Sequence, residues 1–447
     1  MSEWTWAIDG WIVAIGALAA VACAIPGVFL VVRREAMLAD AISHAALPGI
    51  AGAFLMSGTR DPLWMFLGAV VAGLVVALGA RAIAALGRIE PGAALGIAFT
   101  TLFALGLVAI VQVADRVDLD PSCVLFGSLE LAPLDSVRLA GVDIPRAATV
   151  LVAVVTLNAA LAAAFWKELT TTAFDPALAK ALGLRPRMIE CLVLSMAAAT
   201  CVAAFEAVGS ILVVAMFVIP AASARLVTHR LVGMIVAAMG FGVAGAMLGH
   251  WMATSAAPTL LPEGRDASTA GAIAAALGVM FGLAALLSPQ RGAIRRVLDR
   301  AILARRTLRE DALGLLWRLE EDRHTTDERG LAALLVREAD GCPRTAARAI
   351  RRLVREQLLQ VGQGGVRLTD AGRRAGAELV RSHRLWELYL ARRLALAPDH
   401  VHDTAMELEH ITDATMREQL AREGESGGVG ANGLTDPHGR PVPGGPQ

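Results

Sequence analysis

The stretch RREAMLADAISHAALPGIAGAFL, residues 33–55, places Asp40 and His44 inside a run otherwise suited to lipid. The two residues are four positions apart, so on a helix they share one face and can converge on one cation. A charge near the bilayer centre costs roughly 2.5–3.5 kcal/mol on insertion scales and commonly marks function. Because carboxylate and imidazole both bind divalent metals, the spacing favours an ion path. A helix-end Asp at headgroup level, with His44 bonded to a neighbouring helix, fits the same residues.

Apolar runs recur through the first 290 residues, and each is long enough to span a bilayer. We expect an all-α polytopic membrane protein with nine helices, at 11–32, 38–56, 63–86, 92–113, 147–166, 188–205, 208–224, 231–252 and 270–288. The pair that meets at Glu206 could instead be one bent or re-entrant segment. Residues 1–10 hold no Lys or Arg, so we interpret the first run as a retained anchor and not a cleaved signal.

Composition changes sharply near residue 290. Residues 1–290 hold 15 of the 41 Lys and Arg and 18 of the 41 Asp and Glu, while residues 291–447 hold the remaining 26 and 23. The net charge of zero therefore divides into −3 for an apolar half and +3 for a charged half. With the N-terminus outside, the expected inner loops carry ten basic residues and the outer loops five, which satisfies the positive-inside rule. Nine spans then put the charged half in the cytoplasm.

The sequence lacks the pattern of a nucleotide site. The chain has only two lysines, Lys167 and Lys180, and neither follows a Gly-x-x-x-x-Gly run that could cradle phosphates. Its five cysteines include no CxxC pair, which argues against a disulfide framework or a thiolate metal site. We therefore expect that the protein is not an enzyme and that any ATPase activity belongs to a separate chain. Glu206 falls at an outer turn, where it is either solvated or part of a gate.

Four stretches together resemble the metal-ion permeases of ABC importers for manganese, zinc or iron. They are residues 33–55, VLFGSLELAPLDSVRL (124–139), AFDPALAKALGLRPR (173–187) and VGSILVVAMFVIPAASARL (208–226), in the family's order. The segment SAAPTLLPEGRDASTAG (255–271) departs from the family's pattern.

This resemblance implies that Asp40 and His44 line the transport path. On the residues alone, Pro176 and Gly183 indicate a short helix in a cytoplasmic loop. The resemblance makes this loop the coupling helix, with Asp175, Ala179 and Gly183, which inserts into a cytoplasmic ABC ATPase subunit. It also implies an extracytoplasmic metal-binding protein, and pairing either as a homodimer or with a second permease subunit.

The charged half begins with a pattern typical of nucleic-acid-binding proteins. Helices are expected at 309–322, 327–337 and 343–357, followed by a two-stranded wing in LLQVGQGGVRLTDAG (358–372) that turns at Gly364-Gly365. The third helix carries an arginine row that could meet DNA phosphates: Arg344, Arg348, Arg351 and Arg352. A solvated helix face, or a face toward anionic membrane lipid, would show the same row.

The next segment, LTDAGRRAGAELVRSHRLWELYLARRLALAPDHVHDTAMELEHITDATM (368–416), resembles the metal-binding and dimerisation region of iron- and manganese-dependent repressors, as does DPHGRPVP (436–443). Carried over by position, one site consists of His383, Glu387 and His402, and a second consists of Asp311, Met406, Glu409 and His410. Carboxylate and imidazole donors suit a divalent metal. Met406 stands where the family has Cys or a carboxylate, and Gly314 where manganese sensors have Glu, which weakens the second site.

We predict five regions: a permease domain at 1–290, a basic linker at 291–308, a winged-helix-like domain at 309–375, a helical metal-binding and dimerisation region at 376–422, and a disordered tail at 423–447. The leading hypothesis is a permease subunit of the bacterial cytoplasmic membrane that imports Mn²⁺ or Fe²⁺, with Zn²⁺ less favoured. The metal would be both substrate and regulator, with no permanently bound cofactor. The runner-up is a membrane-tethered, metal-dependent transcription regulator that binds DNA, and metal efflux is a third hypothesis.

Overall fold

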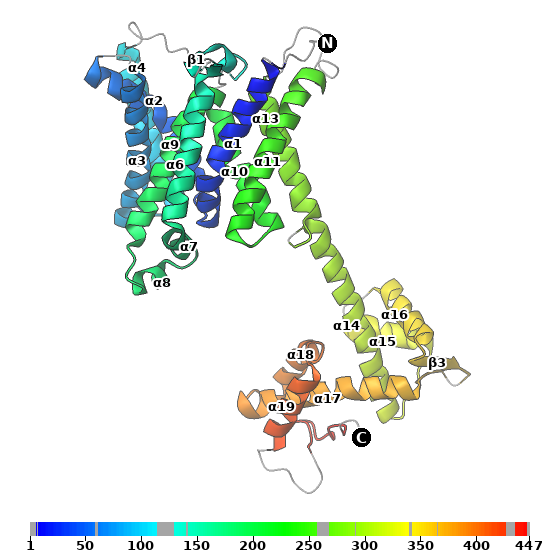
Figure 1. Ribbon diagram of the computed structural model, residues 1–447. Helices are drawn as coiled ribbons and strands as arrows, with labels where there is room; N and C mark the ends of the chain where they lie inside the picture. Colours follow the sequence, from blue (N-terminus) through cyan, green and yellow to red (C-terminus); the bar gives the residue numbers. More distant parts are fainter. Residues whose placement is uncertain are drawn as a thin grey trace. The chain divides into compact units, whose positions relative to one another are not determined.

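The computed structural model describes residues 6, 8–58, 61–113, 129–139, 142–256, 268–290, 292–338, 342–363, 365–425 and 434–444. The chain divides into two compact units, Met1–Arg295 and Arg296–Gln447 (Figure 1). Each unit has its own hydrophobic core. The sharp change of composition near residue 290 therefore coincides with a structural boundary.

The first unit is a bundle of long apolar helices. Among the described residues, nine are long and apolar enough to cross a membrane, which confirms the expected count. They belong to α1 (Asp9–Val32), α2 (Met37–Ser57), α3 (Pro62–Gly87), α4 (Pro91–Val113), α6 (Arg146–Ala164), α9 (Pro186–Val208), α10 (Ser210–Val227), α11 (Leu231–Trp251) and α13 (Thr269–Leu287). The two segments that meet at Glu206 are separate helices, because Gly209 (φ +79°) interrupts the helical conformation between α9 and α10.

Short elements connect these helices. The connection between α4 and α6 contains η2 (Ala132–Leu134) and an antiparallel ribbon of β1 (Ser136–Leu139) and β2 (Val142–Pro145). The loop between α6 and α9 holds α7 (Trp166–Phe174) and α8 (Pro176–Ala181), and a π-helical turn, η3 (Met252–Ala256), extends α11. Most of the divergent segment 255–271 lies outside the described residues.

Small residues let α2 pack closely against its neighbours. At the crossing of α2 and α3, Gly49 meets the backbone of Gly68 and leaves no space for a Cβ atom. At the crossing with α4, Gly106 meets the ring of Pro48 in the same way. Glycine at these positions permits the short interhelical distance that larger side chains would prevent. The helix that carries Asp40 and His44 therefore packs closely against α3 and α4.

The second unit begins as a winged helix. Its elements are α14 (Ala293–Glu321), α15 (Glu328–Glu338), α16 (Pro343–Arg355), β3 (Leu359–Gly362), β4 (Gly365–Leu368), α17 (Asp370–Arg393), α18 (Pro398–Glu409) and α19 (Ala414–Glu425). Strands β3 and β4 pair antiparallel, with Leu359 opposite Leu368, and both side chains enter a core that includes Leu316 of α14 and Ile350 of α16. The predicted wing and helices are confirmed.

Two stretches differ from the expected linker and tail. The linker at 291–308 is helical from Ala293 on, because α14 continues through it into the core. In the tail, residues 434–444 pack against α17 instead of being wholly disordered. The buried Arg384 donates to the carbonyl of Pro441 (2.5 Å) and to Glu321 (3.1 Å). Asp436 accepts backbone hydrogen bonds from His438 and Arg440, which closes a tight turn.

Candidate metal centres

Asp40 and His44 lie on α2 and face each other as their spacing predicts. His44 Nε2 is 3.4 Å from Asp40 Oδ1. The side chains are 29% exposed for His44 and 39% for Asp40, so both remain accessible to an ion. A carboxylate and an imidazole at this separation can bind one divalent cation.

Two aromatic rings of α4 lie beside His44. The His44 ring lies 5.5 Å from the ring of Phe99 and 5.8 Å from that of Phe103, centroid to centroid. Asp40 is in the first turn of α2, so the cost of a charge at the bilayer centre overstates what this residue incurs. Within the described residues, the polar side-chain contact of His44 is with Asp40 and not with a neighbouring helix. Asp40 therefore lies near a helix end, whereas His44 makes its polar contact within the same helix.

The predicted coupling residues shape a short, well-capped helix. Asp175 Oδ1 accepts hydrogen bonds from the backbone N–H groups of Ala177 (3.0 Å) and Leu178 (2.9 Å), which begins α8. Ala179 of α8 is fully buried, and Gly183 (φ +80°) follows the end of the same helix. The loop also exposes apolar side chains, among them Leu178, which is 50% exposed.

Glu206 lies in the last turn of α9, close to the break at Gly209. It lines a cavity of about 290 Å³ together with Asp135 and Arg146. This cavity places Glu206 among other charged groups at that end of the bundle.

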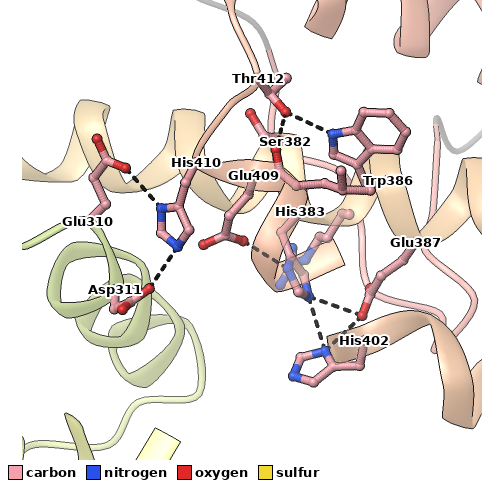
Figure 2. A network of polar contacts seen from close by, with 12 residues as sticks. Glu310, Asp311, Ser382, His383, Trp386, Glu387, His402, Glu409, His410 and Thr412 are labelled. Atoms are coloured by element: carbon pink, nitrogen blue, oxygen red, sulfur yellow. Dashed lines mark hydrogen bonds and ion pairs between the residues drawn. The ribbon is translucent and has the colours of Figure 1, made fainter. Parts of the chain in front are cut away.

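In the second unit, the predicted first site assembles from α17 and α18. His383 Nε2 is 3.0 Å from Glu387 Oε1 and 3.1 Å from His402 Nδ1 (Figure 2). His402 Nδ1 is in turn 2.9 Å from Glu387 Oε1. His383 and Glu387 are almost fully buried, whereas the side chain of His402 is 49% exposed. One ligand atom from each residue lies within 4.8 Å of the others, a set that fits a divalent metal.

The predicted second site joins α18 to α14. Asp311, Glu409 and His410 bring one ligand atom each within 4.8 Å of one another. His410 Nε2 lies 3.0 Å from Asp311 Oδ1, and its Nδ1 lies 2.9 Å from Glu310 Oε2 (Figure 2). The sequence interpretation missed Glu310, although it adjoins Asp311. Both ring nitrogens of His410 thus face carboxylates.

An ion pair connects the two clusters. His383 Nδ1 lies 2.8 Å from Glu409 Oε2, so the ring that serves the first cluster also contacts a donor of the second. Metal-binding imidazoles commonly bond a carboxylate through the second ring nitrogen, which fixes the ring's orientation. Glu409 is well placed for that role.

The carboxylates perturb the titration of both clusters. Burial alone would lower the pKa of His410, but its bonds with Asp311 and Glu310 raise that pKa to about 10. Burial would raise the pKa of Glu387, but its bonds with His383 and His402 hold it at about 2. At neutral pH the metal-free protein therefore holds a protonated His410 and an ionised Glu387. A metal that binds His410 must displace a proton.

Three further residues border these clusters. Met406 is half-buried on α18 one turn before His410, which puts its thioether on the same helix face. Gly314 lies one turn after Asp311, and a Cβ there would meet nothing closer than 3.9 Å. His438, in the turn of the tail, has Nε2 3.9 Å from Glu387 Oε1. The DPHG sequence was the available signal for His438, but its register with Glu387 depends on how the tail folds back.

The predicted DNA-contacting residues, Arg344, Arg348, Arg351 and Arg352, are all exposed on α16. Arg352 also pairs with Glu356 at 2.8 Å. Arg348 and Arg352 line a groove of about 720 Å³ whose other wall is formed by α14.

Two family models match separate parts of the chain, one on each side of the boundary between the units. Residues 8–282 match the family model described as the ABC 3 transport family. Residues 369–444 match that of the iron dependent repressor, metal binding and dimerisation domain.

Two curated relatives and one solved structure resemble this chain over its membrane unit, and one of the relatives matches beyond that unit. The manganese transport system membrane protein MntD of Bacillus subtilis is 39% identical over 291 residues, which cover 65% of this chain and 95% of that protein. The zinc transport system membrane protein TroD of Treponema pallidum is 34% identical over 351 residues, which cover 78% of this chain and 92% of that protein. The structure of PsaBC from Streptococcus pneumoniae in complex with Fab is 26% identical, with a TM-score of 0.52 over 63% of this chain and 92% of that chain.

The family match spans more than half of the chain and includes all nine candidate spans except the last few residues of α13. The repressor match contains both clusters of the second unit except Asp311. This chain belongs to the ABC 3 transport family and carries, after its membrane unit, a metal-binding and dimerisation domain of the iron-dependent repressor type.

Proposed function

We propose that the chain is the membrane-spanning subunit of an ATP-driven importer of divalent transition metals, with Mn²⁺ the favoured substrate. The observation that carries the proposal is the Asp40–His44 pair on a closely packed membrane helix. The named relatives transport manganese and zinc, which supports this class of substrate. Iron fits the same donors and remains a hypothesis. In the proposed topology the N-terminus is outside and the C-terminus is cytoplasmic.

The proposed partners follow from the surfaces of the membrane unit. Phe174, Leu178 and Leu182 recur every four residues and are 50–65% exposed, which suits insertion into a groove of a separate ATPase chain. An extracytoplasmic binding protein would deliver the metal to the opposite face. A second permease chain, identical or related, would complete the path.

We further propose that the cytoplasmic unit senses the transported metal and restrains import when the metal is plentiful. His383, Glu387 and His402 would hold one ion, and Asp311, Glu409 and His410 a second. A bound divalent ion would supply a positive charge that joins α14, α17 and α18 through these donors. Carboxylates and imidazoles without thiolates favour Mn²⁺ or Fe²⁺ over Zn²⁺. Restraint requires that the metal-bound and metal-free units dock differently on the transporter.

Uptake of labelled Mn²⁺ by cells that lack their own importer tests the transport proposal. Cells with the wild-type chain, the ATPase and the binding protein should accumulate Mn²⁺, and unlabelled Fe²⁺ and Zn²⁺ as competitors rank the ions. Asp40→Ala and His44→Ala, expressed at the same level, should fall to background. Normal uptake in both variants would overturn the assignment of the path, and absence of uptake in the wild type would overturn the transport function.

A membrane-tethered transcription regulator is the second candidate. The exposed arginines of α16 beside the β3–β4 wing favour it. Because α14 forms the other wall of the groove at Arg348 and Arg352, a duplex there would also have to pass α14. Sequence-selective retention of DNA by the full chain in nanodiscs, lost on chelation, would favour this candidate over transport control.

A further inference from the structure

Arg81 of α3 holds two carboxylates from different parts of the membrane unit. Its Nη2 lies 2.9 Å from Glu35 Oε1 and 3.0 Å from Glu35 Oε2. Its Nη1 pairs with Glu190 of α9. The three side chains are 27–31% exposed, so solvent screens them less than it screens surface charges. Arg81 thus links the start of α2 to α9 through one guanidinium group.

Glu35 belongs to a tight turn that leads directly into the helix of the transport pair. Arg34 adopts φ +63°, and Glu35 N–H donates to the carbonyl of Leu30 at 2.8 Å. A non-glycine residue in this region of φ is costly and needs the surrounding structure to hold it. Because α2 begins at Met37, a displacement of Glu35 reaches Asp40 within little more than one helical turn.

The same turn contacts the coupling loop. Arg33 Nη2 donates to Thr172 Oγ1 at 3.1 Å, and Thr172 is buried on α7, just before Asp175 and α8. A cavity of about 280 Å³ separates the turn from the loop; its lining includes Pro176, which begins α8. Because this space is not filled by packed side chains, the loop can move relative to the turn without disrupting a close-packed core.

The charge balance makes Arg81 the critical group of this network. Burial raises the pKa of Glu35, while Arg81 opposes that rise. Without Arg81, two partly buried carboxylates would face each other, which favours protonation or separation of one of them. Arg33, in the same turn, also attracts Glu35 and Glu190 electrostatically, but its Nη2 donates to Thr172.

We propose that Arg81 is a positioning residue for transport, whose ion pairs with Glu35 and Glu190 transmit movement of the coupling loop and α9 to the Asp40–His44 segment. This inference rests on the proposed import function. A purely structural clamp would use the same contacts, so the test must separate ATP hydrolysis from metal movement. Loss of Arg81 should leave the ATPase bound and active while less metal moves for each ATP hydrolysed.

The experiment uses the complete importer in proteoliposomes, with Mn²⁺ uptake and ATP hydrolysis measured together. For Arg81→Gln, the ratio of Mn²⁺ transported to ATP hydrolysed should fall about 2- to 30-fold. Arg88→Gln is the matched control, because Arg88 is exposed at the end of the same helix. Its ratio should equal that of the wild type.

Two further variants keep the test informative if Arg81→Gln assembles poorly. Glu190→Gln should lower the ratio on its own, and combining it with Arg81→Gln should add little, since both remove the same pair. Arg81→Lys keeps the charge and should recover part of the ratio. Equal losses of uptake and hydrolysis, or an unchanged ratio, would overturn this inference. A wild-type importer that moves no Mn²⁺ would overturn the proposed function instead.

Discussion

The two regions that offer metal ligands hold them in opposite ways. On α2, two donors lie 3.4 Å apart and remain 29% and 39% exposed. In the second unit, which we propose to be cytoplasmic, six donors form two clusters, and His383 and Glu387 within them are 5% and 2% exposed. A transport path must bind an ion well enough to admit it and weakly enough to release it. The sparse pair suits passage and the dense clusters suit retention, so similar ligand chemistry can serve transport in one unit and sensing in the other.

The largest expected effect is a separation of the two functions by substitution. Asp40→Ala should reduce Mn²⁺ uptake to background and leave Mn²⁺ binding by the cytoplasmic unit unchanged, because the pair and the clusters share no residue. Glu387→Gln should instead reduce Mn²⁺ binding by that unit and retain Mn²⁺ uptake. Cellular uptake and calorimetric titration of the purified full chain provide the two measurements. If either variant lost both properties while still folded, the regions would not be functionally distinct.

The next effect concerns affinity within the clusters. Glu409→Gln removes a donor of the second cluster and also the 2.8 Å partner of His383. It should therefore lower the Mn²⁺ affinity of both clusters, by about 10- to 100-fold at the first, where it acts through His383 alone. Met406→Leu, which lies on the same helix, is the control and should affect the second cluster only. An unchanged first cluster in Glu409→Gln would show that the contact with His383 has no influence on binding.

Binding in the cytoplasmic unit should also depend on pH. His410 has a pKa of about 10 in the metal-free protein, so Mn²⁺ must displace its proton at pH 7. The Mn²⁺ affinity of the second cluster should therefore rise as the pH is raised from 7 toward 10. Titration calorimetry in buffers of different ionisation enthalpy measures the released proton, and His410→Gln should abolish that release. Release that persists in His410→Gln would assign the proton to another group.

The same pKa has a consequence for stability without metal. A raised pKa means that the folded state binds the proton more tightly than the unfolded state does. The ion pairs of His410 therefore contribute fully below the ordinary histidine pKa of about 6.5, and their contribution is lost as the pH rises through about 10.

The smallest effect is a gain. Gly314 lies one turn from Asp311, and a Cβ there would meet nothing closer than Arg318 Nη2 at 3.9 Å, so Gly314→Glu can start a carboxylate side chain beside the second cluster without a clash at its Cβ. We expect the Mn²⁺ affinity of the second cluster to increase several-fold. This gain is smaller than that from a preorganised ligand, because the new side chain must become ordered when the metal binds. Gly314→Gln is the matched control, since it adds the volume without the charge. Equal affinities in both variants would exclude a role for the carboxylate.

Periodicity and spacing predicted the parts of this protein that depend on local sequence. The nine spans followed from runs of apolar residues, and the His383–Glu387 contact followed from their separation by four residues. Contacts between distant segments were less accessible. The bond between Glu310 and His410 and the approach of His438 to Glu387 depend on how α14 and the tail pack against α17 and α18. The link from Arg81 to Glu35 and Glu190 likewise joins α3, the turn before α2 and α9, which the sequence alone does not align.

The most direct test of the account measures Mn²⁺ uptake by cells depleted of manganese and by cells loaded with it. The wild-type chain is compared with Glu387→Gln, whose transport pair is intact. We predict that loading slows initial uptake in the wild type several-fold and leaves uptake by Glu387→Gln close to its depleted rate. The same slowing in both would show that the cytoplasmic clusters do not restrain transport, and the two metal-binding regions would then have no regulatory connection.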